Sequence, residues 1–202
     1  EPSPPVRFVT LCRGRSMSKL AGPLAICVFL AGASLPASLR AQESTRAPQP
    51  IDPSWLSYDA ASKTVHFQLI AGLTGLNGAL NFNGYRDAGL VLVVPAGSKV
   101  VVDFTNHDGM LPHSAEVIAG KLPVPSGATD PAIERAYTDK LEEGLPPQAT
   151  NGMTFTATPP GDYFIFCGVP GHGQSGMYIG LKVSSDAKTP SLMRAPQKPA
   201  AK

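Results

Sequence analysis

Apolar residues recur at every second position in a series of short runs along this chain, and β-branched and aromatic residues are frequent in these runs. This spacing is typical of β-strands that bury one face. Runs of this kind cover residues 64–71, 90–94, 99–105, 114–119, 153–158, 163–167 and 177–183. Turn sequences such as Asn83-Gly84 and Pro159-Pro160-Gly161 separate them. The pattern predicts an all-β fold, specifically an antiparallel β-sandwich.

One segment between the predicted strands has a different spacing. Its apolar residues lie four apart: Ile133, Tyr137 and Leu141. Asp130 and Pro131 precede them and Gly144 follows them, which are the residue types preferred before, at the start of and after a helix. We therefore expect residues 130–143 to form one short helix inserted at the surface.

The first 41 residues differ from the rest of the chain. Residues 1–16 contain no Met and resemble sequence upstream of the true start, so we expect them not to be native. A short basic start at Met17, an apolar stretch over residues 20–35 and small residues up to Ala41 form the three-part pattern of a secretory signal peptide. The apolar stretch is shorter than the roughly 20 residues of a membrane span. We expect cleavage near Ala41 and export to the periplasm or cell surface, with an uncleaved N-terminal anchor over 17–41 as the alternative.

Composition divides the rest of the chain into three parts. Residues 42–60 are polar and rich in Pro, which predicts a linker, and residues 187–202 have the composition of a flexible C-terminal tail. The folded domain is expected over residues 61–186. From residue 42 onward the chain has 12 basic and 14 acidic residues, and no basic cluster of the kind that nucleic-acid binding needs. Nucleic acid is therefore excluded as a partner.

The cysteines give the first indication of chemistry. Cys12 and Cys27 lie in the predicted leader, so Cys167 would be the only thiol of the exported protein and could form no internal disulfide. It begins a Gly-rich loop in which His172 and Met177 follow at intervals of five residues. Thiolate, imidazole and thioether are soft donors that suit copper, and a site with two histidines, one cysteine and a weak axial methionine is a blue-copper electron-transfer site.

Such a site needs a second histidine, and His113 is the preferred candidate because a strand pattern follows it directly. His107 competes with it, although its position in the middle of a turn favours a solvated side chain. Met110 and Gln174 are alternatives for the axial position. Taken one at a time, each candidate residue is more often an ordinary core or surface residue. Their joint occurrence favours a metal site.

Several segments together resemble those of sulfocyanin-type blue copper proteins. They are residues 81–84 (Asn-Phe-Asn-Gly), 94–97 (Val-Pro-Ala-Gly), 104–106 (Phe-Thr-Asn), 111–113 (Leu-Pro-His) and 167–177 (Cys-Gly-Val-Pro-Gly-His-Gly-Gln-Ser-Gly-Met). The resemblance implies a Greek-key cupredoxin β-sandwich with one type 1 copper per chain. It also implies that the ligands are His113, Cys167, His172 and axial Met177, and that the protein transfers electrons in a respiratory chain.

The expected function is therefore an exported, monomeric electron carrier and not an enzyme, with redox partners of the cytochrome or terminal oxidase type. A periplasmic copper carrier or chaperone is one alternative, but such proteins favour Met-rich or His-rich tracts and the five Met residues here do not cluster. A copper-dependent oxidoreductase is a weaker alternative because its extra copper centres need many histidines, and this chain has four. Around the predicted site, we expect Ser114 to connect the two ligand loops, Asn106 to cap a turn and the His172 ring edge to reach the surface.

Overall fold

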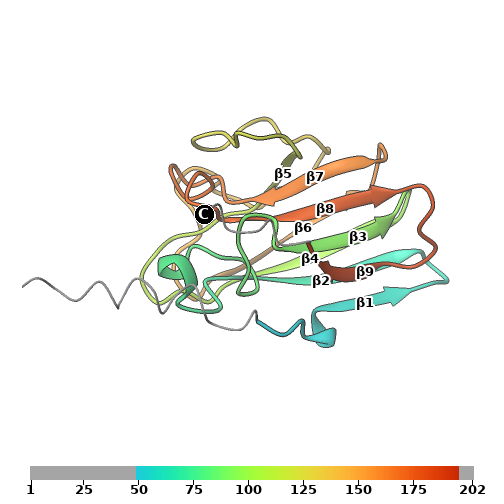
Figure 1. Cartoon of the computed structure of the whole chain (residues 1–202), viewed down its shortest axis with the longest axis horizontal. Helices are drawn as coiled ribbons and strands as arrows, with labels where there is room; N and C mark the ends of the chain where they lie inside the picture. Colours follow the sequence, from blue (N-terminus) through green and yellow to red (C-terminus); the bar gives the residue numbers. More distant parts are fainter. Residues whose placement is uncertain (1–48, 196–202) are drawn as a thin grey trace, which may run out of the picture. The chain divides into compact units, whose positions relative to one another are not determined.

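The structure, a computed structural model, describes residues 49–195, which form two β-sheets (Figure 1). The first sheet has the strand order β1-β2-β4-β6, and the second has the order β5-β7-β8-β3-β9. The strands are β1 (Leu56–Asp59), β2 (Thr64–Ala71), β3 (Leu90–Pro95), β4 (Lys99–Asn106), β5 (Glu116–Ala119), β6 (Thr150–Thr156), β7 (Gly161–Phe166), β8 (Tyr178–Ser184) and β9 (Ser191–Arg194). Two short 3-10 turns, η2 (Pro53–Trp55) and η3 (Leu76–Ala79), accompany them.

The sheets are mixed rather than purely antiparallel. β2 lies parallel to β4, and β3 lies parallel to β8, whereas β4 with β6 and β7 with β8 are antiparallel. The parallel pair of β2 and β4 arises because the chain leaves the first sheet after β2, forms β3 in the second sheet and returns as β4. Two strands that are joined through the opposite sheet can run in the same direction without a helical crossover. The predicted all-β sandwich is therefore confirmed, with this correction to its strand directions.

One apolar core holds residues from both sheets, and strict alternation along the strands builds it. In β2, Val65, Phe67 and Leu69 are fully buried while His66 and Gln68 are exposed. β3 and β4 repeat the pattern, whereas five of the seven residues of β8 are buried. Burial of one such large apolar side chain contributes about 1.5–3 kcal/mol.

The predicted helix over residues 130–143 is wrong. Three backbone hydrogen bonds of 2.8 Å join this segment to β5 and the residue before it: Ala132 to Val117, Val117 to Ala136, and Thr138 to Ala115. Ile133 is buried while Tyr137 is exposed, so apolar residues four apart do not share a face. The N–H and carbonyl groups along β5 bind part of this segment, so it does not form a helix. Within the described residues, its one i to i−4 bond closes a single turn at its end, from Gly144 N–H to the Lys140 carbonyl (2.7 Å).

The ends of the domain also differ from the prediction. Residues 53–59, expected in a linker, form η2 and β1, and β1 pairs with β2. Residues 191–194, expected in a loose tail, form β9 and pair with β3. The predicted non-native segment over 1–16, the predicted signal peptide over 17–41 and the outer parts of the linker and tail lie outside the described residues. Among the described residues, no helix is long and apolar enough to cross a membrane.

Candidate metal centre

Three side chains from two loops converge at one end of the sheets. His113 comes from the segment between β4 and β5, Cys167 directly follows β7, and His172 lies in the loop that joins β7 to β8. One potential ligand atom from each lies within 4.8 Å of the other two. The two Nδ1 atoms of His113 and His172 are 3.3 Å apart, and Cys167 Sγ lies 3.6 Å from His172 Nδ1. Two imidazoles and a thiol therefore face a common centre.

The loop from Cys167 to Met177 is held closed by its own backbone. Cys167 N–H donates to the Met177 carbonyl and Met177 N–H donates to the His172 carbonyl, each over 3.1 Å. Gly173 allows the loop to lie flat on the core, because a Cβ at this position would come within 1.8 Å of Phe166 Cε2. The spacing of five residues thus places His172 at the tip of a compact turn and returns Met177 beside Cys167.

Cys167 is completely buried, and burial raises the pKa of its thiol to about 11. The backbone N–H of Ser114 points at its sulfur over 3.5 Å. Ser114 Oγ accepts a hydrogen bond from Gly168 N–H (3.1 Å) and donates one to the Leu141 carbonyl (2.7 Å). The expectation that Ser114 connects the two ligand loops is confirmed. A thiol in this environment keeps its proton at neutral pH unless a cation replaces it.

Both imidazoles of the cluster are held neutral. Burial lowers the pKa of His113, and burial together with the neighbouring His113 lowers the pKa of His172 to about 4. A neutral imidazole keeps one nitrogen lone pair, which is the form that binds a metal ion. His113 is fully buried, whereas His172 is half-buried, so the His172 ring is the part of the cluster nearest to solvent.

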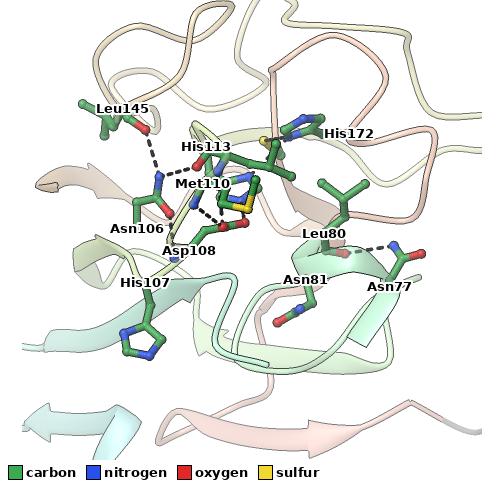
Figure 2. Close-up of polar contacts among 12 residues, drawn as sticks. Asn77, Leu80, Asn81, Asn106, His107, Asp108, Met110, His113, Leu145 and His172 are labelled. Atoms are coloured by element: carbon green, nitrogen blue, oxygen red, sulfur yellow. Dashed lines mark hydrogen bonds and ion pairs between the residues drawn. The ribbon is translucent and has the colours of Figure 1, made fainter. Parts of the chain in front are cut away.

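Polar groups behind His113 fix its loop (Figure 2). Asn106 Nδ2 donates to the carbonyls of Leu111 and Leu145, each over 2.9 Å, which confirms its expected capping role. His113 Nε2 lies 3.0 Å from Asp108 Oδ2. The sequence analysis missed Asp108. A carboxylate five residues before a candidate ligand, in the same turn, was the available signal.

The other candidates lie outside the cluster of three. His107 is exposed, and its ring points away from His113 and His172 in Figure 2. His66 is exposed on β2, Gln174 is exposed, and 85% of Met110 is accessible to solvent. Met177 is fully buried at the end of the closed loop.

The donor set fits a soft metal ion. A buried thiol and two neutral imidazoles, supported by hydrogen bonds from surrounding loops, offer one sulfur and two nitrogen donors of the kind that copper prefers. The hydrogen bond from the far ring nitrogen of His113 to a carboxylate is typical of metal-ligating histidines. A hard cation such as Mg²⁺ or Ca²⁺ would instead need oxygen ligands.

The chain is similar to several known proteins. The sulfocyanin (SoxE) domain family matches residues 53–193. Sulfocyanin of Sulfolobus acidocaldarius is 29% identical over 140 residues, which cover 66% of this chain and 70% of that protein. Among solved structures, rusticyanin from Thiobacillus ferrooxidans is 25% identical. The match covers 73% of this chain and 92% of the rusticyanin chain, with a TM-score of 0.46. Auracyanin A, a blue copper protein from Chloroflexus aurantiacus, is 21% identical. The match covers 60% of this chain and 99% of the auracyanin chain, with a TM-score of 0.44.

Proposed function

We propose that this chain, which belongs to the sulfocyanin (SoxE) domain family of blue copper cupredoxins, holds one type 1 copper ion and transfers single electrons. The proposed ligands are His113, Cys167, His172 and, in the axial position, Met177. The observation that carries the proposal is the convergence of a fully buried thiol with two imidazoles, whose ligand atoms lie within 4.8 Å of one another. When bound, copper supplies a couple between its +2 and +1 states.

The protein's own part is to present these donors in a fixed arrangement. Cys167 gives up its proton when it binds, and the Ser114 N–H directed at its sulfur stabilises the resulting thiolate. The backbone bonds of the 167–177 loop and the hydrogen bonds of Ser114 Oγ keep the two loops in place. A site that moves little between two oxidation states lowers the cost of rearrangement during electron transfer.

The half-buried His172 ring supports a route for the electron. Cys167 and His113 are fully enclosed, so we assign the contact with redox partners to the surface around His172, which includes the exposed Pro170. From residue 42 onward the net charge is −2. So small a charge gives little long-range steering, which favours brief encounters over a small contact area. We propose partners of the cytochrome or terminal oxidase type at the periplasmic or cell-surface side of a respiratory chain.

Burial of the donors favours electron transfer over copper delivery. A carrier must hand over its ion, which requires donors that an acceptor protein can reach. Here Cys167 and His113 have no accessible surface. Four protein donors would also leave no position for a substrate, which argues against a copper enzyme.

The visible absorption spectrum of the copper(II)-loaded protein tests this function. We expect an intense blue or green band that Cys167→Ala abolishes and His113→Ala removes or strongly alters. His107→Ala is the matched control and leaves the band unchanged. A colourless copper(I) complex would indicate a carrier. A band shifted by azide or nitrite would reveal an open coordination position and indicate an enzyme.

A further inference from the structure

Asp108 receives three hydrogen bonds on its two carboxylate oxygens (Figure 2). Oδ1 accepts from the backbone N–H groups of Met110 (2.8 Å) and Leu111 (3.2 Å). Oδ2 lies 3.0 Å from His113 Nε2. Only 7% of Asp108 is accessible to solvent, and His113 is fully buried. One carboxylate oxygen thus binds the backbone of its own turn, and the other binds the histidine.

The position of this carboxylate is fixed from behind. Asp108 N–H donates to Asn106 Oδ1 over 3.0 Å, and Gln148 Nε2 donates to the Asp108 carbonyl over 3.2 Å. Gly72 packs against it so closely that a Cβ on Gly72 would lie 2.8 Å from Asp108 Cβ. The surrounding chain therefore holds Asp108 in one arrangement.

This arrangement determines which ring nitrogen of His113 carries the proton. Both oxygens of a carboxylate accept hydrogen bonds, so Nε2 must be the protonated nitrogen. Nδ1 then carries the lone pair, and it is the atom that lies 3.3 Å from His172 Nδ1. An asparagine has only one accepting oxygen. If that oxygen accepts hydrogen bonds from the N–H groups of the turn, the asparagine places its amide nitrogen next to His113 Nε2. That nitrogen can only donate, so it cannot accept a hydrogen bond from a protonated Nε2.

We propose that Asp108 is a positioning residue that keeps His113 Nδ1 directed at the cluster, strengthens it as a ligand for copper(II), and thereby lowers the reduction potential of the site. This inference rests on the proposed function. A negative charge beside a ligand in a region that excludes water favours the more highly charged ion. The hydrogen bond to a carboxylate also raises the basicity of the imidazole, and copper(II) gains more from this than copper(I).

The proton position is tested without copper. In the copper-free full-length chain, nitrogen-15 NMR of the His113 ring is expected to show a protonated Nε2 and an unprotonated Nδ1. Asp108→Asn should reverse this assignment. Asp108→Ser, which retains an acceptor for the N–H groups of its turn, should leave a mixture of the two forms. An unchanged ring in both variants would overturn the proposal.

The potential is tested on the copper-loaded protein by spectroelectrochemical titration. We expect both variants to have a higher potential than the wild type, because copper(II) affinity falls by about 10–100-fold on loss of such a partner. Each tenfold loss of copper(II) affinity relative to copper(I) affinity raises a one-electron reduction potential by about 59 mV. Asp103→Asn, which removes the same charge at an exposed position on β4, is the matched control and should leave the potential unchanged.

The two possible failures are distinguishable. A wild-type protein that binds copper without colour contradicts the proposed function, and the NMR assignment then decides the role of Asp108 alone. A coloured protein in which both variants keep or lower the wild-type potential contradicts the inference about Asp108 and leaves the proposed function intact.

Discussion

The backbone N–H of Ser114 is directed at the sulfur of Cys167 across 3.5 Å, although 53 residues separate them in the chain. Ser114 follows one proposed ligand and Cys167 is another, so this contact joins the two halves of the site. The Ser114 hydroxyl adds bonds to Gly168 N–H and the Leu141 carbonyl. The geometry of the site therefore depends on a residue that does not itself bind the metal.

Ser114→Ala should destabilise the fold while it preserves the colour of the site. The variant keeps the N–H directed at sulfur but leaves the buried Gly168 N–H without its partner, which costs about 1–3 kcal/mol. Urea denaturation measures the loss, and the absorption spectrum reports the site. Ser191→Ala, at an exposed position on β9, is the control and should change neither. Full loss of the visible band in Ser114→Ala would show that the hydroxyl has a larger role than connecting the loops.

Gly173→Ala tests how closely the ligand loop rests on the core. Its Cβ would lie 1.8 Å from Phe166 Cε2, so either the ring or the loop must move. Overpacking of this kind costs about 1–3 kcal/mol, and displacement of His172 should shift the visible band. Gly109→Ala is the control because a Cβ there meets nothing within 4 Å. The double variant Gly173→Ala with Phe166→Leu should recover part of both losses, and a failure to recover would place the strain elsewhere.

Glu116 is a buried acid in β5. It is fully enclosed, its Oε1 accepts from Thr129 N–H over 3.1 Å, and its Oε2 has no hydrogen-bond partner among the described residues. Burial, with a smaller contribution from the charge of Asp130, raises its pKa from 4.5 to about 7. Between these two values the folded state holds a proton that the unfolded state has lost.

The free energy of unfolding should therefore fall as pH rises from about 4.5 to 7, by up to about 3 kcal/mol from this group. Glu116→Gln cannot ionise and should show a flatter dependence. Urea denaturation of the copper-free protein at several pH values measures the difference between the two proteins. The titration of His172 is common to both and cancels. Parallel pH profiles would mean that Glu116 ionises freely in the folded state.

Pro170→Glu tests the surface assigned to redox contact. Electron self-exchange between oxidised and reduced copies needs no identified partner and would use the same surface. A carboxylate on each copy must be brought together and desolvated, so we expect exchange to slow by roughly tenfold, which corresponds to about 1.4 kcal/mol. Thr189→Glu adds the same charge beyond the opposite end of β8 and serves as the control. Equal rates in the two variants, with unchanged spectra, would place the contact elsewhere.

Strands could be predicted well from sequence where buried and exposed positions alternate over enough residues to form a recognisable pattern. Each of the seven predicted runs corresponds to a strand, because inward positions such as Phe67 and Leu69 alternate with outward ones. β1 and β9 gave no such signal. They have four residues each, and their side chains are half-buried or exposed, so their pairing depends on neighbouring strands rather than on their own composition.

Part of the candidate site could be predicted from sequence, because residue types and their spacing identify its metal-binding side chains. Three features selected the residues that the structure brings together: Cys167 as the only cysteine after the predicted leader, the loop that carries His172, and the position of His113 before a strand. The role of Met177 as a ligand stays a prediction. Asp108 could not be selected, because its importance comes from the direction of its carboxylate toward His113 Nε2. That direction depends on a turn held by Asn106 and Gln148.

The irregular segment over residues 130–143 has a consequence for how copies of this protein meet one another. β5 is the outermost strand of its sheet, and an outermost strand offers unpaired N–H and carbonyl groups to any other extended chain. Here three 2.8 Å hydrogen bonds already bind Val117 of β5 and the preceding Ala115 to the segment. A second molecule could add a strand beside β5 only after it had displaced this segment. The segment therefore protects this edge of the sheet from aggregation by strand addition.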